Sequence, residues 1–287
     1  MIDWVMSCWN QKQGGFGSSP KHDAHAHSTL SAIQILITQD AFDRLDIEAI
    51  TSFYLSLQNP TTGSFAGDSW GETDTRFTYI AVSALSLLGT LDRLNREKTI
   101  SWLRRCRNFD GGFGSGEGGE SHGSQVFVCV GALAILDALE TEVDVDILAG
   151  WLAERQLPNG GMNGRPEKLE DVCYSFWNLS ALSILGKLHW IDQEKLIKFI
   201  LDCQDLEGGG IGDRPENMVD VFHTIFGLAG LSILGYKGLD EIDPVYCMPA
   251  SVIDRVGLRK PYQIGSRPDS DHQVSSVSGE GKGSEVK

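Results

Sequence analysis

The sequence lacks any long uninterrupted apolar run, and it has few basic residues. No stretch of 18 apolar residues occurs, so a membrane-spanning helix is not expected. Residues 1–6 lack the basic region and the cleavage site of a signal peptide. Only 24 Lys and Arg stand against 39 Asp and Glu, giving a net charge of −15 that argues against nucleic acid and anionic membranes as direct partners. An anionic ligand would therefore need a local cluster of cations.

Cysteines are also few, and they are scattered. The six cysteines lie at positions 8, 106, 129, 173, 203 and 247, most of them within apolar helical patterns. This distribution is typical of reduced thiols and argues against a disulfide framework, so we expect a cytoplasmic protein. A length of 287 residues with 41% apolar residues allows one large core or two modest ones.

A glycine-rich turn recurs about every 49 residues. The apolar residue after the glycines falls at positions 16, 65, 113, 162 and 211. A helical signature with small residues follows each turn, at 31–36, 83–88, 131–136, 180–185 and 229–234. A fixed period of this length indicates a repeat architecture.

Each repeat is predicted to contain two helices. One, such as residues 172–185, is apolar on nearly every face and should be buried on both sides. The other, such as residues 192–203, is amphipathic and has Asp192 as its N-cap. Buried helices inside amphipathic ones predict an all-α fold with two concentric layers of antiparallel helices.

One stretch combines side chains that suit a metal. Asp171 and Cys173 lie two residues apart, and His223 follows about 50 residues later. Oxygen, sulfur and nitrogen donors suit Zn²⁺, and three protein ligands leave a fourth position open, as in catalytic zinc sites. Because residues i and i+2 of a helix point about 200° apart, Asp171 must precede the helix for both to reach one metal. The plainer interpretation is a helix cap, a small buried apolar residue and a core imidazole.

The repeat places polar residues at the same point before four buried helices. Fourteen residues before the last leucine of the later signatures stand Asp74, His122, Asp171 and Asp220. If the inner helices run parallel, their N-termini gather at one mouth and favour an anionic ligand there. Arg165 and Lys168, just upstream of Asp171, are suited to hold a phosphate. Helix capping explains the carboxylates but not the His, Cys, Arg and Lys of the same ring.

The two ends of the chain differ from the repeats. Residues 3–10 read as the end of an outer helix with no inner helix before it. Residues 22–27, His-Asp-Ala-His-Ala-His, are either a metal-binding tract or, more simply, a polar loop before a helix at about Thr29. From about Arg259 the chain is rich in Ser, Gly and charge, which predicts a disordered tail at 259–287 after a helical domain at 1–258.

Several stretches resemble the β subunits of protein prenyltransferases, over roughly residues 1–256. They are residues 71–77 (GETDTRF), 164–177 (GRPEKLEDVCYSFW), 217–224 (NMVDVFHT) and 247–249 (CMP), and they are most similar to Rab geranylgeranyltransferases. The resemblance implies an α/α toroid of helical hairpins with a zinc site at Asp171, Cys173 and His223. It also implies that the lipid diphosphate is bound by His122, Gly123, Ser124, Arg165, Lys168 and Tyr174. The isoprenoid cavity is then lined by Tyr79, Phe127, Phe176 and Trp177.

By this resemblance the chain is expected to be a catalytic β subunit. It would move geranylgeranyl from geranylgeranyl diphosphate to C-terminal cysteines of Rab GTPases through a zinc-bound thiolate. Its partners would be an α subunit and an escort protein that presents the Rab. Asp213 matches a magnesium-linked carboxylate of farnesyltransferases. The simpler interpretation of Asp213 is a solvated turn residue before Arg214 and Pro215. The alternatives are a farnesyltransferase or type I geranylgeranyltransferase β subunit, or a toroid that only binds an α subunit; the absence of Asp-x-Asp-Asp argues against a terpene cyclase.

Two features depart from the family pattern. Family members carry further helices ahead of the point where this sequence begins, so an N-terminally truncated chain with a gap in its inner wall is expected. Residues 26–28, Ala-His-Ser, are smaller and more polar than the family pattern at this place. Both departures predict low stability and low activity for the chain on its own.

Overall fold

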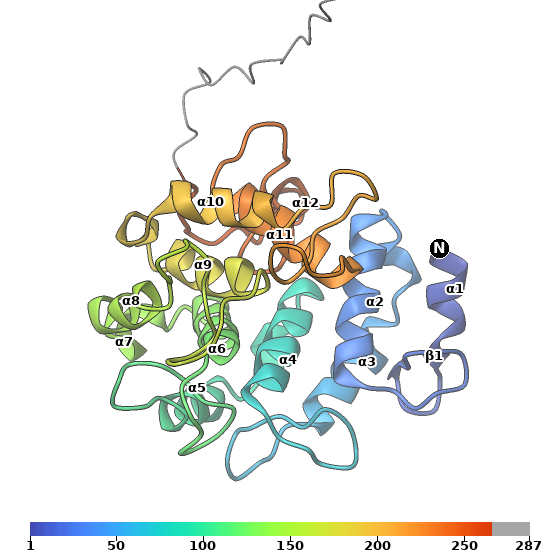
Figure 1. Cartoon of the computed structure of the whole chain (residues 1–287). Coiled ribbons are helices and arrows are strands. Elements are labelled where there is room, and N and C mark those ends of the chain that lie inside the picture. Colours follow the sequence, from blue (N-terminus) through green and yellow to red (C-terminus); the bar gives the residue numbers. More distant parts are fainter. Residues whose placement is uncertain (266–287) are drawn as a thin grey trace, which may run out of the picture.

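The computed structural model describes residues 1–265, which fold almost entirely into helices (Figure 1). Within these residues the strands are confined to two antiparallel hairpins. The first pairs β1 (Trp9–Asn10) with β2 (Gly15–Phe16), and the second pairs β3 (Ile242–Asp243) with β4 (Met248–Pro249). The same part of the chain contains no helix long and apolar enough to cross a membrane.

Five buried helices form the inner layer, and each packs against the next in chain order. They are α2 (Ala26–Thr38), α4 (Thr75–Leu87), α6 (Gly123–Ile135), α9 (Tyr174–Ile184) and α11 (Val221–Ile233). In α4 every residue except Arg76 is buried, because neighbouring helices cover it on both sides. The prediction of helices buried on nearly every face is confirmed for α4, α6 and α9, whereas α2 and α11 each have exposed residues.

Shorter amphipathic helices form the outer layer, as Figure 1 shows for α5, α8 and α10. In α10, Leu196, Phe199 and Ile200 face the core, and the predicted N-cap Asp192 accepts the amide hydrogen of Lys195 at 3.0 Å. The outer helices are α1 (Ile2–Ser7), α3 (Ile47–Ser56), α5 (Arg96–Arg105), α8 (Val145–Ala153), α10 (Gln193–Asp202) and α12 (Ala250–Arg255). Single turns lead into four of them: η1 (Phe42–Arg44), η2 (Leu91–Arg93), α7 (Leu139–Glu142) and η3 (Leu188–Trp190).

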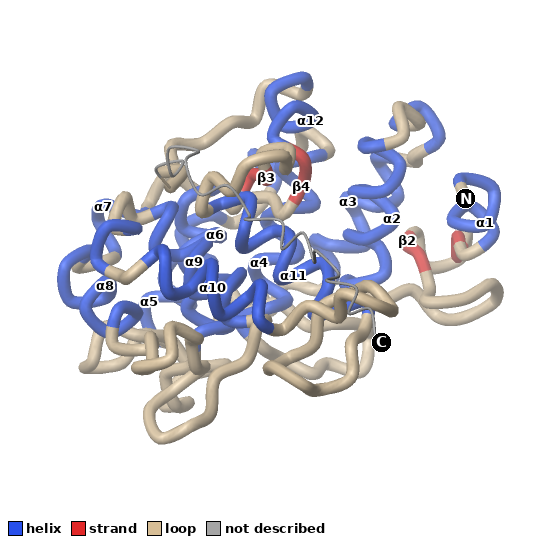
Figure 2. Tube along the Cα trace, turned by 45° about the horizontal axis from the view of Figure 1, so that its top comes forward, coloured by secondary structure: helices blue, strands red, loops and turns tan. Residues whose placement is uncertain are grey.

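The inner helices begin at one mouth, where the long loops lie. Figure 2 shows most of these loops, in tan, along one side of the molecule. Three predicted residues, Asp74, His122 and Asp220, are N-caps whose side chains accept an amide hydrogen two residues later. Parallel inner helices therefore bring the capping residues of different repeats to one end, as predicted.

The first repeat requires a correction of register. The repeat pattern in the sequence places Leu36 at the position of Leu88. In the structure Leu36 corresponds to Leu85, because the carbonyls of Leu36 and Leu85 each accept the amide hydrogen of the residue five positions later. The inner helix α2 consequently begins three residues before the predicted start at about Thr29, and His25 is its N-cap. A three-residue shift keeps apolar residues on nearly the same face of a helix, so the pattern alone did not reveal the error.

The predicted boundary of the polar tail at residue 259 also lies too early. Residues 259–265 run along the toroid, where the Gln263 amide donates to the Ser183 carbonyl at 2.9 Å and the Gly265 amide to the Ile233 carbonyl at 2.8 Å. A polar composition does not prevent such backbone hydrogen bonds, so composition alone did not place residues 259–265 on the toroid. The rest of the predicted tail, residues 266–287, lies outside the described residues.

One face of α11 is apolar and exposed. Val221, Phe222 and Ile225 expose 75%, 69% and 56% of their surface, and Leu228 continues the face. In the inner layer α11 packs against α9, and this face points away from that contact. An inner helix with one covered flank keeps part of its apolar surface in water, and this exposure opposes folding.

Candidate metal and diphosphate site

Side chains from two repeats meet at the mouth of the toroid. Asp171 and Cys173 precede α9, and His223 lies in the first turn of α11. Their ligand atoms lie within 4.8 Å of one another, and His223 Nε2 is 3.3 Å from Asp171 Oδ1. Tetrahedral zinc with bonds of about 2.0–2.3 Å holds its ligand atoms roughly 3.5 Å apart. The three residues therefore fit Zn²⁺, and a fourth position remains for another ligand.

The start of α9 explains how residues two apart reach one point. The helix begins at Tyr174, so Asp171 precedes it, as the geometry required. Asp171 Oδ1 accepts the amide hydrogen of Cys173 at 2.8 Å. The carboxylate thus caps the turn that leads into α9 and also lies beside Cys173 and His223, so the two interpretations drawn from the sequence are compatible.

The Cys173 thiol is buried in this arrangement. Burial, and then the neighbouring Asp171 carboxylate, raise the pKa of Cys173 well above its ordinary value. Zinc binds the thiolate, so metal binding at these residues would be coupled to loss of the Cys173 proton.

Asp220 orients the imidazole of His223. Its Oδ1 caps α11 by accepting the amide hydrogens of Phe222 and His223, at 2.8 and 2.9 Å. Its Oδ2 lies 2.5 Å from His223 Nδ1, which leaves Nε2 facing Asp171. A carboxylate behind a histidine ligand is the usual second contact of zinc sites. Partial burial lowers the pKa of His223, but the bond to Asp220 and the charge of Asp171 outweigh it and raise the pKa.

Sequence reasoning treated Asp220 only as a cap. The available signal was its position three residues before a predicted ligand on the same helix, where i and i+3 side chains are neighbours. Within the described part of the chain no second cluster of metal-binding side chains occurs. Of the histidines in residues 22–27, His22 lies in a loop, as the simpler interpretation predicted, whereas His25 caps α2 and His27 lies in its first turn.

A hollow of about 290 Å³ adjoins the proposed ligands and holds the predicted cations. Asp171 and Asp213 also line it, together with one cation that was not predicted, Arg214. The lining residues are His122, Arg165, Lys168, Leu169, Glu170, Asp171, Tyr174, Asp213 and Arg214. Four of the six residues predicted to bind a diphosphate thus lie around one space.

His122 and Tyr174 are linked across this hollow. The Tyr174 hydroxyl lies 3.3 Å from His122 Nε2. Burial and the nearby Arg165 lower the pKa of His122. Burial, with Cys173 and Asp171, raises the pKa of Tyr174 to about 12. Both side chains are therefore uncharged at neutral pH and can form hydrogen bonds with a phosphate beside the cations.

Arg165 is already paired with a carboxylate at the rim. Its guanidinium donates to Glu120, and both side chains are partly exposed. A phosphate bound at Arg165 would compete with Glu120 for the same donors. Sequence reasoning did not single out Glu120, which lies two residues before His122.

Gly123 and Ser124 lie beside the hollow, but their amide hydrogens are already engaged. The Gly123 amide donates to the Gly164 carbonyl at 2.7 Å. The Ser124 amide donates to His122 Nδ1 at 3.3 Å, and its hydroxyl lies 2.8 Å from the same atom. Their contribution to the site is thus to hold His122 and the loop at Gly164, and direct phosphate binding by them stays a prediction.

Asp213 also has partners within its own loop. Its Oδ2 accepts from Arg214 at 3.1 Å and its Oδ1 from Asn217 at 2.9 Å. Its carbonyl accepts the amide hydrogen of Val172 at 3.0 Å, which connects the loops before α9 and α11. A magnesium role for Asp213 stays a prediction.

An aromatic series extends from the hollow into the toroid. Successive ring centroids lie 5.1–5.8 Å apart in the order His122, Tyr174, Trp177, Phe226, Phe176, Phe127 and Tyr79. At its far end the Tyr79 hydroxyl donates to the Val245 carbonyl at 2.7 Å. The series contains all four residues predicted to line the isoprenoid cavity. Phe226 was missed, although it stands one repeat, 49 residues, after Trp177.

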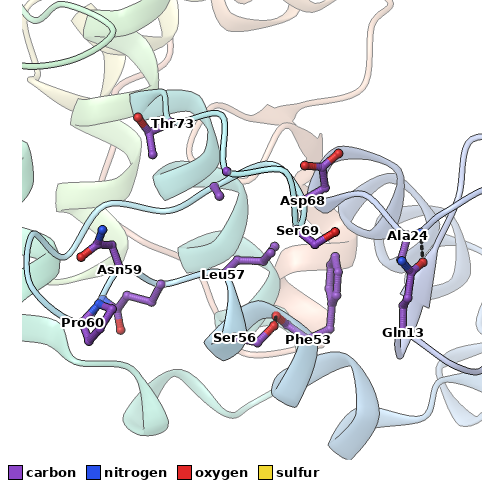
Figure 3. A pocket seen from close by; sticks show the side chains of 13 residues that line it. Gln13, Ala24, Phe53, Ser56, Leu57, Asn59, Pro60, Asp68, Ser69 and Thr73 are labelled. Carbon is purple, nitrogen blue, oxygen red and sulfur yellow. Dashed lines mark hydrogen bonds between the residues drawn. The ribbon is translucent and has the colours of Figure 1, made fainter.

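A larger hollow, of about 610 Å³, lies apart from this chemistry. Figure 3 shows Phe53, Asp68 and Asn59 around it, with Gln13 accepting the Ala24 amide hydrogen at one side. Asp68 Oδ1 accepts the amide hydrogen of Trp70 at 2.8 Å, as in an ordinary turn. No Lys, Arg, His or Cys lines this hollow, so it lacks the cations and the nitrogen and sulfur ligands that mark the site at the mouth.

Comparison with known proteins agrees with the fold. The family model of the prenyltransferase alpha-alpha toroid domain matches residues 1–248. The chain is 53% identical to the geranylgeranyl transferase type-2 subunit beta of Saccharomyces cerevisiae and 56% identical to that of Candida albicans; each match covers 89% of this chain and 80% of the relative. The solved Candida albicans protein geranylgeranyltransferase-I complexed with GGPP has the same fold, with a TM-score of 0.82 at 23% identity, over 89% of this chain and 83% of that one. The chain therefore belongs to the prenyltransferase α/α-toroid family and, within it, to the β subunits of type-2 geranylgeranyltransferases.

Proposed function

We propose that this chain is the catalytic β subunit of an enzyme that transfers geranylgeranyl from geranylgeranyl diphosphate to C-terminal cysteines of Rab GTPases. One observation carries the proposal: the zinc-type ligands Asp171, Cys173 and His223 lie next to a hollow lined by Arg165 and Lys168. A site for a thiol-binding metal thus adjoins a site for a diphosphate. The identity of 53–56% to type-2 β subunits favours this class of prenyltransferase.

The residues of the hollow act on the leaving group. When bound, zinc keeps the thiol of the protein substrate deprotonated at neutral pH. The sulfur forms a bond to C1 of the lipid as the C1–O bond breaks and pyrophosphate leaves. Arg165 and Lys168 offset the negative charge that develops on this pyrophosphate, and the protonated Tyr174 donates a hydrogen bond to it.

The rest of the site binds and orients. The aromatic series from Trp177 to Tyr79 holds the isoprenoid chain by apolar contact. Asp220 keeps His223 Nε2 directed toward the metal position. No nucleophile from this chain is required, because the attacking sulfur belongs to the protein substrate.

The proposal includes partners and a location. The chain pairs with an α subunit, and an escort protein presents the Rab substrate. Its six cysteines are free thiols, which supports a reducing compartment, the cytoplasm.

The proposal is tested with the full chain and an α subunit. We expect transfer of labelled geranylgeranyl to an escort-bound Rab, and loss of transfer in Arg165→Ala. Binding of geranylgeranyl diphosphate should weaken much more than binding of geranylgeraniol in this variant. Arg93→Ala, which removes a cation paired with Glu48 on the outer surface, is the matched control. Equal weakening for both ligands in Arg165→Ala would show that Arg165 is structural.

A further inference from the structure

Two buried asparagines support the loop that carries Arg165 and Lys168. Asn163, 2% exposed, precedes the loop, and the fully buried Asn178 lies within α9. Asn163 Nδ2 donates to the Lys168 carbonyl at 2.9 Å and so closes residues 163–168 across their base. Asn178 Nδ2 donates to the Asn163 carbonyl at 2.9 Å and connects this base to α9.

The loop combines a backbone turn common to the repeats with a contact of its own. Glu167, between the two cations, has a φ of 66°, and Lys21, Gly118 and Glu216 have a similar φ at the same place of other repeats. The ring of Tyr174 lies against Gly164, where an added Cβ would be 2.4 Å from the ring. The loop that carries Arg165 and Lys168 therefore lies against the Tyr174 ring, and its base is hydrogen-bonded to α9.

The two amides occur only in the repeat that carries these cations. At the place of Asn163 the other repeats have Gly17, Ala66, Gly114 and Gly212. At the place of Asn178 they have Ala32, Ala81, Cys129 and Gly227. Small side chains without an amide therefore satisfy the packing of the toroid at both positions. The following loop has Arg214 at the place of Arg165 but Asn217 at the place of Lys168, so the asparagines occur in the loop that carries both cations.

The amides also bring a cost that packing does not explain. Asn163 Oδ1 and Asn178 Oδ1 are buried and accept no hydrogen bond within the described structure. A buried acceptor without a partner destabilises the folded state. Local destabilisation of this kind is typical of functional sites, where positions are fixed for the ligand at the expense of stability.

We propose that Asn163 and Asn178 are positioning residues that set the spacing and direction of Arg165 and Lys168 for a lipid diphosphate. The inference rests on the proposed function and extends it to residues outside the hollow. Neither amide lines the hollow, so both act through the loop at 163–168.

The test measures binding of geranylgeranyl diphosphate and geranylgeraniol to the full chain. We expect Asn163→Ala to weaken diphosphate binding about three- to tenfold, the effect of losing one buried hydrogen bond, and to leave alcohol binding unchanged. Asn178→Ala should act in the same direction, and it provides the same test if Asn163→Ala does not fold. Asn159→Ala is the matched control, because it removes an exposed asparagine contact, to Glu170, that lies outside the loop at 163–168. Zinc content should stay constant throughout.

A double-mutant cycle separates positioning from general stability. In an Arg165→Ala, Lys168→Ala background, Asn163→Ala should have no further effect on diphosphate binding. A full additional effect there, equal weakening of alcohol binding, or unchanged diphosphate binding in Asn163→Ala would overturn this inference and leave the proposed function intact. If the unsubstituted chain did not prefer the diphosphate over the alcohol, the proposed function would fail and this inference with it.

Discussion

Two carboxylates at the mouth each have two roles, since they cap the start of a helix or turn and also contact the proposed metal site. Asp171 caps the turn that leads into α9 and lies among the proposed metal ligands. Asp220 caps α11 and holds His223. Because capping fixes the position of each carboxylate, the site gains its geometry from interactions that the helices need in any case. Substitutions that preserve the cap should therefore reveal the second role.

Asp220→Asn is expected to weaken zinc binding about 10- to 100-fold, because asparagine still caps α11 but no longer offers a carboxylate to His223 Nδ1. Competition for zinc against a chelator measures the change. Asp74→Asn is the control, since Asp74 caps α4 at the same place in its repeat and has no histidine partner. Equal zinc affinity in both variants would contradict the role of Asp220.

Glu120→Gln is expected to tighten binding of geranylgeranyl diphosphate about two- to fivefold, the typical contribution of an exposed ion pair. In this variant the Glu120 carboxylate no longer competes with the diphosphate for Arg165. Titration at low and high salt measures the change, which should shrink as salt increases. Glu117→Gln is the matched control, since Glu117 pairs with Arg105 instead. Weaker binding in Glu120→Gln would mean that Glu120 orients Arg165 for the ligand.

Residue types predicted the centre of the site, but not its supports. The donor set of Asp171, Cys173 and His223 is rare enough in combination to be noticed in the sequence. Asn163 and Asn178 were not noticed, because an asparagine before a loop and another within a helix have no distinguishing pattern. Their role depends on hydrogen bonds to backbone carbonyls, which only the folded chain shows.

At the scale of helices and loops, the repeat predicted the layers well and the ends less well. The inner and outer helices alternate as the period indicates, because each repeat buries one apolar helix between neighbours. The register of α2 was wrong by three residues, and residues 259–265 were assigned to the tail. In both places the decisive contacts are backbone hydrogen bonds, which side-chain periodicity does not report.

The β3–β4 hairpin carries a buried carboxylate whose ionisation opposes folding. Asp243 Oδ1 accepts the amide hydrogens of Val245 and Tyr246 at 2.8 and 2.9 Å, whereas Oδ2 has no partner among residues 1–265. Burial raises the pKa of Asp243 from 3.8 to about 6. The folded chain therefore binds this proton more tightly than the unfolded chain, and its stability decreases as pH rises from about 4 to 6.

Asp243→Asn is expected to raise the free energy of unfolding at pH 7 by up to about 3 kcal/mol, because the amide keeps the Oδ1 acceptor without a charge. At pH 4, where Asp243 is largely protonated, the gain should be small. Chemical unfolding at both pH values measures it, and Asp240→Asn, an exposed position, is the control. A gain independent of pH would contradict the ionisation argument.

At the scale of the whole molecule, an acidic chain concentrates a few cations at one mouth. The net charge is −15, yet Arg165, Lys168 and Arg214 line one hollow. Parallel inner helices add their N-terminal partial charges at the same end. Glu170, Asp171 and Asp213 line the same hollow. Under the proposed function, the cations of this mouth hold the anionic headgroup and the aromatic series holds the lipid chain.

The central claim is that this mouth holds zinc through side chains of two different repeats. The most direct measurement is the metal content of the full chain together with its cobalt-substituted absorption spectrum. We predict one zinc per chain, a thiolate-to-cobalt band, and loss of both in Cys173→Ser and His223→Ala. Cys203→Ser, at a buried cysteine after α10, should retain both. Full zinc content and an unchanged cobalt band in Cys173→Ser and His223→Ala would contradict the account.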